Sequence, residues 1–538
     1  MSDGRKKDRF FSGVAVLTLS TVVVKIIGLL YKIPMMRYLG EEGMGYFNSA
    51  YEIYTLFYIL ATAGLPVAVS ILVAESAEKE NASGIKRIFS VSLTLFIVLG
   101  LAGTAVLYFG AERFSELIEN SGALLSITAI APMVLFVCVS SAVRGYFQGF
   151  QNMIPTALSQ VIEAAGKLFL GLAFAVRAVK SGGDMQTSAA WATFGITVGE
   201  GISMIYLITA KLFEKNKIHN TLPPTIKLEN RGRIAKNIIK IAVPITLSSV
   251  VISLTRVVDL FMILRRLQAI GYSEASANAV YGSYTTLAIS MFNLPASFVT
   301  PIALAIVPVL TSAINGGDKY KEITALNSSL RLSGLITIPA SLGLSMFSRP
   351  ILELVFKGET SAINTAAPLL SVLGISVFFS CMMTVSNAVL QGYGKERIPL
   401  LSMSLGAVVK IVLSYVLIGI PEINVYGAAI STFLCSLTVS LVNFVYIKKS
   451  ASDVEAPIKL FGGTLAAAVI SVAVGGVAYV AFVKYIGSSS ALTVAAMGIT
   501  ALLFAILALK FGAVKESDLS LLPAGDKMCI ILKKTKLI

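Results

Sequence analysis

The chain has 538 residues, of which 56% are hydrophobic and 14% are charged, and its mean hydropathy is +0.81. Soluble globular proteins carry about 25% charged residues, so this composition excludes an ordinary soluble domain and predicts a protein that crosses a membrane many times. The net charge of +15 lies mostly in loops, where it indicates topology and not nucleic-acid binding. Four scattered cysteines and one histidine form no ligand spacing, so we expect no metal site, disulfide framework or cofactor.

Apolar runs long enough to cross a bilayer follow one another along the chain. A spanning helix needs about 20 apolar residues, and fourteen segments meet that requirement. In chain order they are 12–38, 44–74, 86–109, 122–147, 154–178, 188–212, 236–263, 277–313, 329–355, 364–390, 398–420, 425–447, 459–484 and 491–511. The eighth contains Pro295 and Pro301, which predict a kinked helix. The sequence therefore predicts an all-α, polytopic membrane protein with about fourteen transmembrane helices.

Basic residues are concentrated in alternate loops. The N-terminus, the C-terminal tail and the loops after the second, sixth, eighth and twelfth spans are rich in Lys and Arg, whereas the other loops are poor in them. The loop after the sixth span, 211–236, has seven basic residues, and the loop after the eighth has Lys319, Lys321 and Arg331. Since basic loops stay in the cytoplasm, we expect both termini there. An even number of spans agrees with this topology.

Two parts of the chain repeat each other. Residues 141–171 are similar to residues 386–416: each has Q-G at a helix end, a short turn, I-P opening the next helix, and then a lysine, Lys167 or Lys410. Residues 15–33 are similar to residues 242–263. Parallel repeats of this kind usually enclose a substrate path and exchange access by rocking. The predicted parts are a six-helix half at 1–212, a basic cytoplasmic connector at 213–235, a second six-helix half at 236–448, two additional helices at 459–511 and a cytoplasmic tail at 512–538.

Three cations in the predicted spans are candidates for substrate binding. Lys25 and Lys32 lie seven residues apart in the first span and therefore on one face of it. Lys25 is too deep for its amine to reach an interface easily, whereas Lys32 has two alternatives, a cavity or the outer interface. Arg256 is in the seventh span, where its alternatives are a structural ion pair and a substrate contact. A cavity lined by Lys25, Lys32 and Arg256 would bind an anionic headgroup, because ammonium and guanidinium groups pair with phosphate.

Two carboxylates accompany these cations. Asp259 follows Arg256 by three residues, so the two side chains share a helix face. Glu52 lies near the outer end of the second span, within possible pairing range of Lys32 or Arg37. We name Asp259 and Glu52 as candidates for ion coupling or ion pairing.

Four further ionisable residues lie in the fourth, fifth and sixth spans. Glu163 and Lys167 have the i, i+4 spacing that favours a pair, which we expect to be structural. Arg144 lies at the cytoplasmic end of its span, where snorkelling or a lipid headgroup contact is expected. The sequence identifies no partner for Glu200.

Several stretches resemble one transporter family. "KIIGLLYKIPMMRYLGEEGMGYFNSAYEIYTLFYILATAGLPVAVSILVAE", "RGYFQGFQNMIPTALSQVIE" and "VLQGYGKERIP" are similar to the polysaccharide-exporter branch of the MOP superfamily, and within it to the YtgP- and SpoVB-like relatives of the MurJ lipid II flippases. The resemblance implies a flippase of the bacterial cell membrane. Its substrate would be an undecaprenyl-diphosphate-linked sugar, namely lipid II for peptidoglycan biosynthesis, moved from the inner to the outer leaflet by alternating access. The last two helices would help to form a groove for the lipid tail.

The resemblance to MurJ-type proteins implies cavity arginines in spans 1, 2 and 8. The cation pattern of this chain departs from that arrangement. Lys25 stands at the first of these positions and Tyr31 at the second, with Lys32 beside it. Spans 2 and 8 have no arginine here. Lipid II as cargo therefore follows from the resemblance, whereas the charges themselves indicate a large anionic lipid-linked substrate.

Three alternatives stay open at this point. The first is a flippase for another polysaccharide unit or for a spore-cortex precursor. The second is a MATE-type cation-coupled drug exporter, against which the lysines of the first span argue. The third is an integral-membrane glycosyltransferase or polymerase, but the sequence has no D-x-D motif, His-rich loop or nucleophile constellation, so we do not expect an enzyme. Nothing in the sequence indicates a protein partner.

Overall fold

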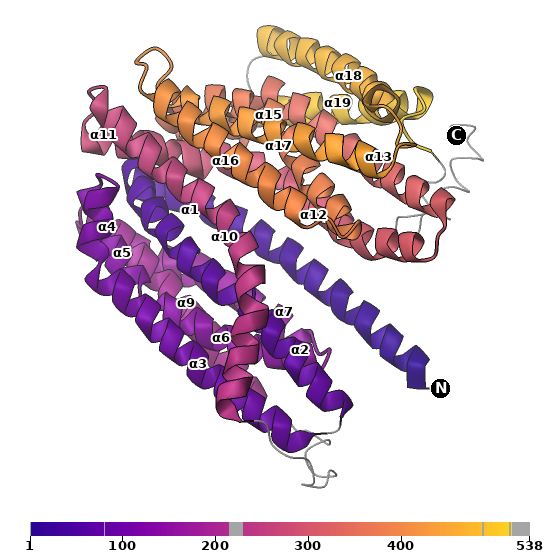
Figure 1. The fold of residues 1–538 in the computed structure, drawn as a ribbon. Helices are drawn as coiled ribbons and strands as arrows, with labels where there is room; N and C mark the ends of the chain where they lie inside the picture. The colour runs from indigo at the N-terminus through magenta and orange to yellow at the C-terminus, as the bar shows by residue number, and fades with distance from the viewer. Residues whose placement is uncertain (1, 80, 215–229, 487–488, 516–517, 519–538) are drawn as a thin grey trace. The chain divides into compact units, whose positions relative to one another are not determined.

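The computed structural model describes residues 2–79, 81–214, 230–486, 489–515 and 518. Every regular element in this part of the chain is a helix (Figure 1). The helices form two compact units, Met1–Gly282 and Ser283–Ile538. The predicted all-α, multi-span class is therefore confirmed. Most of the predicted C-terminal tail, 512–538, and most of the predicted connector, 213–235, lie outside the described residues.

The first unit contains eleven α-helices with short 3₁₀ and π elements between them. They are α1 (Ser2–Thr62), α2 (Leu65–Glu78), α3 (Ala82–Phe109), α4 (Ala111–Leu117), the 3₁₀ turn η1 (Ser121–Ala123), α5 (Leu124–Ile130), α6 (Met133–Gly149), α7 (Ile154–Gly166), the π-helical turn η2 (Lys167–Gly171), α8 (Leu172–Lys180), α9 (Met185–Leu212), α10 (Arg231–Ala269) and α11 (Glu274–Ser283). Pro155 lies in the first turn of α7, where its missing N–H removes no helical hydrogen bond.

Helix α1 is two rods joined at Gly40. This residue has φ 62° and ψ −172°, a backbone conformation that residues with a Cβ rarely adopt. The rod before Gly40 corresponds to the first predicted span, and the rod after it, continued by α2, corresponds to the second. The break therefore places Lys25 and Lys32 on one rod and Glu52 on the next.

Helix α10 packs against α1, α2 and α3, within the first compact unit. The sequence repeat placed this helix at the start of the second half, at 236–448. The first compact unit thus extends beyond the predicted half, 1–212, and includes Arg256 and Asp259.

The second unit is built around α15. Its elements are the π-helical turn η4 (Tyr284–Ala288), α12 (Ile289–Asn315), α13 (Lys319–Met346), α14 (Ser348–Val355), α15 (Thr360–Gly392), α16 (Arg397–Ile418), α17 (Tyr426–Ser450), α18 (Pro457–Ile486) and α19 (Ser490–Lys510). Helix α15 packs against α12, α13 and α17. The pair α18–α19, yellow in Figure 1, joins this group because α18 packs on α13.

Fewer helices than fourteen are long and apolar enough to cross a membrane. The described residues contain ten, or up to eleven if the bent pair α13–α14, with its 84° angle, is one span. One 59-residue stretch, Ser20–Glu78, holds most of the first predicted span, 12–38, and all of the second, 44–74. The fifth predicted span is divided by the π turn η2 into α7 and α8, and the seventh, α10, carries several charges. In the eighth, η4 departs from α-helical geometry before Pro295 and Pro301 are reached.

Candidate functional site

The first unit brings Lys32, Glu52 and Arg256 near one another. Lys32 comes from the first rod of α1, Glu52 from the second rod and Arg256 from α10. Both Glu52 and Arg256 are close enough to act electrostatically on Lys32, the carboxylate by attraction and the guanidinium by repulsion. Three residues that are far apart in the sequence are thus placed in one electrostatic environment.

Lys25 and Asp259 complete the set of candidates. Lys25 lies two helical turns before Lys32 on the same rod and is exposed, as is Arg256, whereas Asp259 is half-buried. Counted together, the five candidates carry three positive and two negative formal charges. This balance favours an anionic ligand over a cationic one, and the exposed amine and guanidinium are the groups able to bind it.

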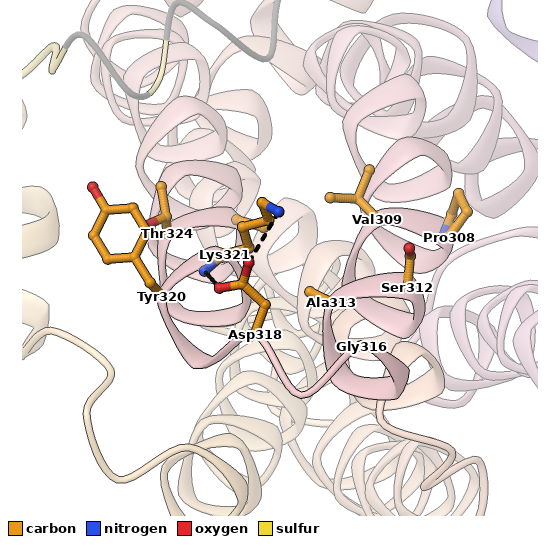
Figure 2. A pocket seen from close by; sticks show the side chains of 10 residues that line it. Pro308, Val309, Ser312, Ala313, Gly316, Asp318, Tyr320, Lys321 and Thr324 are labelled. Carbon is orange, nitrogen blue, oxygen red and sulfur yellow. Dashed lines mark hydrogen bonds and ion pairs between the residues drawn. The ribbon is translucent and has the colours of Figure 1, made fainter.

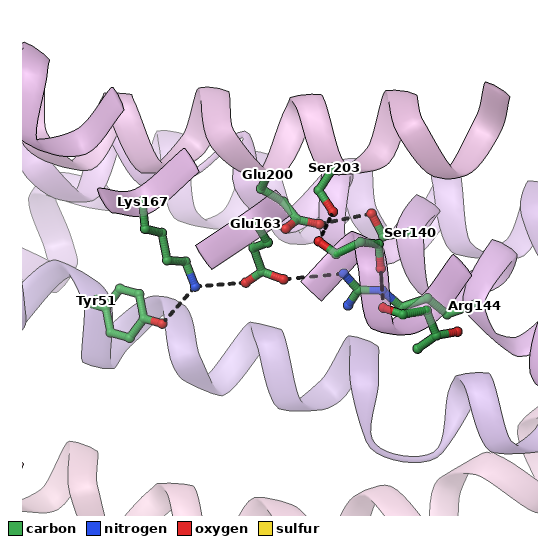
Figure 3. A network of polar contacts seen from close by, with 9 residues as sticks. Tyr51, Ser140, Arg144, Glu163, Lys167, Glu200 and Ser203 are labelled. Atoms are coloured by element: carbon green, nitrogen blue, oxygen red, sulfur yellow. Dashed lines mark hydrogen bonds and ion pairs between the residues drawn. The ribbon is translucent and has the colours of Figure 1, made fainter. Parts of the chain in front are cut away.

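A second polar network fills the interior of the first unit (Figure 3). At its centre is Glu163 of α7, which is 7% exposed. One of its carboxylate oxygens accepts a hydrogen bond from Lys167 Nζ at 2.8 Å and the other accepts one from Arg144 at 3.3 Å. The predicted pair of Glu163 and Lys167 is present, and a second cation is bonded to the same carboxylate.

The outer members of this network are also buried. Arg144, 5% exposed, donates through Nε to the Ser159 hydroxyl at 3.0 Å. Glu200 of α9 is fully buried and accepts a hydrogen bond from the Ser140 hydroxyl at 2.9 Å. Arg144 therefore does not snorkel to an interface as expected, because its helix packs against α7 and α9 and both of its hydrogen-bond partners come from α7. Glu200, for which the sequence identified no partner, lies beside the same cluster.

Close helix packing and a π turn position this network. A Cβ built on Gly166 of α7 would lie 2.5 Å from the Gly199 Cα of α9, so the two backbones are nearly in contact. Small residues permit such crossings between membrane helices. Gly199 directly precedes Glu200, and the π turn η2 begins at Lys167, directly after Gly166. Turns of this kind occur frequently at functional sites.

A row of aromatic rings connects the two groups of charges. Tyr31, Phe47, Tyr51, Tyr54 and Tyr58 follow one another along α1 with centroid separations from 5.8 to 6.1 Å. At one end Tyr31 precedes Lys32, and in the middle the Tyr51 hydroxyl lies 3.4 Å from Lys167 Nζ (Figure 3). The rod after Gly40 therefore carries Glu52 and the tyrosine that contacts the buried network.

The second unit has a cavity of about 740 Å³ between α12 and α13 (Figure 2). Its walls are Pro308, Val309, Ser312, Ala313, Gly316, Asp318, Tyr320, Lys321, Thr324 and Ala325. Asp318 caps α13 by accepting a hydrogen bond from the backbone N–H of Lys321 at 3.0 Å, which lowers the pKa of the carboxyl group. None of the predicted site residues lines this cavity.

An ion cluster attaches the last two helices of the second unit. Arg331 of α13 is 3% exposed and pairs with Glu455 at 2.9 Å and with Asp518 at 3.2 Å. Lys515, which follows α19, pairs with Glu455 at 2.8 Å. Burial acts to raise the pKa of Glu455, but the Lys515 hydrogen bond and the charge of Arg331 lower it below its ordinary value. The sequence assigned Arg331 to a loop, whereas α13 begins twelve residues earlier, at Lys319.

The described residues contain no group of three or more His, Cys, Asp or Glu side chains that could hold a metal ion.

Comparison with known proteins gives two matching family models. The model described as a polysaccharide biosynthesis protein matches residues 10–314, which is more than half of the chain. The MatE model matches residues 244–416.

Two curated relatives come from Bacillus subtilis (strain 168). The lipid II flippase MurJ of this organism is 28% identical over 461 residues, covering 82% of this chain and 83% of that protein. Stage V sporulation protein B is 27% identical over 538 residues, covering 97% of this chain and 99% of that protein.

Solved structures show the same fold. A lipid II flippase MurJ in an inward closed conformation superposes with a TM-score of 0.71 and 16% identity, covering 92% of this chain and 98% of that chain. An inward-facing multidrug resistance MATE transporter of the MOP superfamily superposes with a TM-score of 0.66 and 16% identity, covering 80% of this chain and 94% of that chain. At this level of identity the likeness establishes the fold alone.

Proposed function

Because this chain belongs to the polysaccharide biosynthesis protein family, we propose that it is a flippase for an undecaprenyl-diphosphate-linked cell-wall precursor. The proposed cargo is lipid II, carried from the inner to the outer leaflet of the bacterial cell membrane for peptidoglycan biosynthesis. Support for this cargo comes from the relative named as a lipid II flippase, which matches four-fifths of the chain.

The observation that carries the proposal is the grouping of cations in the first unit. Lys32, Glu52 and Arg256 share one electrostatic environment, and Lys25 stands on the same rod as Lys32. In this proposal Lys25, Lys32 and Arg256 bind the diphosphate, which carries two negative charges and pairs with ammonium and guanidinium groups. Asp259 and Glu52 limit the positive charge of the site when no cargo is bound. They are also the candidates for coupling transport to the movement of an ion.

Transport then follows an alternating-access cycle. The six-helix repeats, 1–212 and 236–448, rock about the site while the polyprenyl tail stays in the lipid beside α18 and α19. Both termini are cytoplasmic in this proposal, because the basic loops alternate along the chain. The negative diphosphate is bound from the cytoplasm and released outside when the site opens there.

Depletion of the protein in its host tests this function. We expect lipid II to accumulate on the inner leaflet and externally accessible lipid II to fall. Unchanged externally accessible lipid II, in a strain from which every other flippase of this type has been removed, would overturn the proposal.

A second candidate cargo is a precursor used during sporulation. It is supported by the relative named stage V sporulation protein B, which covers 97% of this chain, more than the MurJ relative covers. Expression confined to sporulation, with normal lipid II export in growing cells, would favour this candidate.

A cation-coupled drug exporter is a third candidate, supported by the MatE match over residues 244–416. Lysines in the first span disfavour it, because a cationic drug would be repelled by them. Drug-efflux measurements on cells that overproduce the protein distinguish a drug exporter from a flippase. We expect no change in drug efflux. All three candidate functions are those of carriers, and none of them is an enzymatic activity.

A further inference from the structure

The buried carboxyl group of Glu200 has one oxygen that lacks a hydrogen-bond partner. Its Oε1 accepts from Ser140, whereas no described protein group bonds to its Oε2. The residue is fully buried on α9. An ionised carboxylate in such a place loses the solvation of water and gains only one hydroxyl bond in return, which is a costly arrangement.

The same carboxyl group lies beside that of Glu163 in the buried network (Figure 3), and the two groups interact electrostatically. Two ionised carboxylates can only accept hydrogen bonds, so a bond between them requires a proton. Carboxyl groups placed this closely share one proton, because they cannot both ionise without strong repulsion. The Gly166–Gly199 crossing brings the two helices close together beside these carboxyl groups, since each glycine lies within a helical turn of one of the two glutamates.

We propose that Glu163 and Glu200 form a buried proton-binding site, in which Glu200 carries the proton and donates it to Glu163. The cations of the cluster decide which carboxyl group holds the proton. Lys167 and Arg144 both bond to Glu163, at 2.8 and 3.3 Å, and stabilise it as the anion. The described residues include no ion pair to Glu200.

Every element packed on α9 agrees with this assignment. Helix α6 contributes Ser140 and Arg144, α7 contributes Glu163 and η2 contributes Lys167. From α1, the Tyr54 ring is close enough to interact electrostatically with Glu200.

The three remaining elements, η1, α5 and α8, add no nearby charge, and η1 has no titratable residue. Helix α5 has no titratable residue, and the basic residues Arg177 and Lys180 of α8 stand in its last turn. The same surroundings disfavour Na⁺, because Lys167 and Arg144 would lie beside the metal ion and repel it.

The route by which this proton is exchanged passes through Lys167. Its side chain is 22% exposed, whereas those of Arg144 and Glu163 are 6% and 9% exposed. Movement of Lys167 away from Glu163 opens the carboxyl pair and leaves Glu163 able to accept the proton. In a carrier this proton is the coupling ligand, a step that rests on the proposed function, whereas proton binding itself does not.

Infrared spectroscopy of the full-length protein in lipid nanodiscs tests proton binding directly. We expect a protonated-carboxyl C=O band at neutral pH in the wild type. The band should be lost in Glu200→Gln and kept in Glu116→Gln, a control at a carboxylate that is 58% exposed. In Ser140→Ala the band should move to higher frequency, because the carbonyl oxygen loses its hydroxyl donor. A wild-type protein without this band, or a band unchanged in both Glu200→Gln and Ser140→Ala, would overturn the site.

Transport in proteoliposomes tests the coupling step separately. With lipid II as cargo, we expect a pH gradient to stimulate wild-type flipping and to have no effect on Glu200→Gln. Stimulation of both proteins, or stimulation of the wild type by a Na⁺ gradient alone, would overturn the coupling. Absence of wild-type flipping under every gradient would instead contradict the proposed function and leave the infrared result standing.

Discussion

Gly166 and Gly199 face each other where α7 crosses α9, and a Cβ built on Gly199 would lie 2.8 Å from the Gly166 Cα. Because neither backbone has room for a methyl group, we expect Gly199→Ala to force the helices apart. Overpacking of a close-packed site costs about 1–3 kcal/mol. The loss of stability should appear as a lower thermal midpoint of unfolding in detergent. The protonated-carboxyl C=O band in the infrared spectrum should also become weaker.

Gly201→Ala is the matched control for this substitution. It lies on the same helix, but its added methyl group would meet the Phe136 ring at 3.4 Å, an ordinary van der Waals distance. We expect its thermal midpoint to stay at or slightly above that of the wild type, since alanine favours helix over glycine by about 1 kcal/mol. Equal destabilisation by both variants would refute the role given to the Gly166–Gly199 crossing.

Loss of the Glu163 carboxylate should destabilise the first unit strongly. Glu163→Ala leaves Arg144 and Lys167 without the anion that binds both of them. Removing one partner of a buried ion pair costs about 3–5 kcal/mol. Chemical unfolding in detergent measures the change, and Glu116→Ala is the comparison because its pair with Arg113 is exposed and worth about 0–1 kcal/mol. A loss no larger than that of Glu116→Ala would show that the network contributes little to stability.

The Arg331–Glu455 cluster predicts a dependence of stability on acid. Because the pKa of Glu455 is lowered in the folded state, its contribution is complete above the usual glutamate pKa of about 4.3. The contribution is lost as the pH falls through the lowered, folded-state value. Glu455→Gln should therefore reduce stability at neutral pH and make the acid-induced loss smaller. Thermal midpoints across an acid titration provide the measurement.

Glu422→Gln is the control for that titration, because Glu422 is an exposed residue in the segment between α16 and α17. We expect its acid titration to follow the wild type. If Glu455→Gln also follows the wild type at every pH, the cluster does not link the pH to the stability of the second unit.

Replacement of Lys25 tests the proposed cation site. Lys25→Ala removes a charge-assisted hydrogen bond worth about 1.5–3 kcal/mol, which is roughly a 10- to 100-fold loss in apparent affinity for the cargo. Lys25→Arg should retain most of the function, because guanidinium also pairs with phosphate. Complementation of a depleted strain measures the function of both Lys25 variants, with their amounts in the membrane matched. Lys79→Ala, at the exposed end of α2, is the control. Equal function of Lys25→Ala and Lys25→Arg would remove the cation role.

The all-α class could be predicted from the sequence because about 20 consecutive apolar residues leave few alternatives to a membrane-spanning helix. The i, i+4 spacing of Glu163 and Lys167 likewise predicted their pairing, since neighbours on a helix face are determined locally. The number of spans was less certain, because Gly40 breaks one apolar stretch and the π turn η2 interrupts another. Neither break has a distinctive signal in hydropathy.

The partners of Arg144 could not be predicted. Its carboxylate partner, Glu163, is 19 residues away on another helix, and the burial of Arg144 depends on how closely α7 and α9 pack. Glu200 and Arg331 present the same difficulty, because their partners come from other helices or, for Asp518, from 187 residues away. Gly166 and Gly199 were the available sequence signal for close packing of α7 and α9. Their meaning becomes clear only when these two helices are known to be neighbours.

Flipping of lipid II by the purified protein tests the central proposal most directly. Lipid II would be incorporated into proteoliposomes, and the fraction reached by an externally added reagent that cannot cross the bilayer would be followed in time. We expect this fraction to rise toward completion with the wild-type protein, slowly with Lys25→Ala, and not at all in protein-free vesicles. A fraction that stays constant with wild-type protein, or a rise that is identical with Lys25→Ala, would contradict the account.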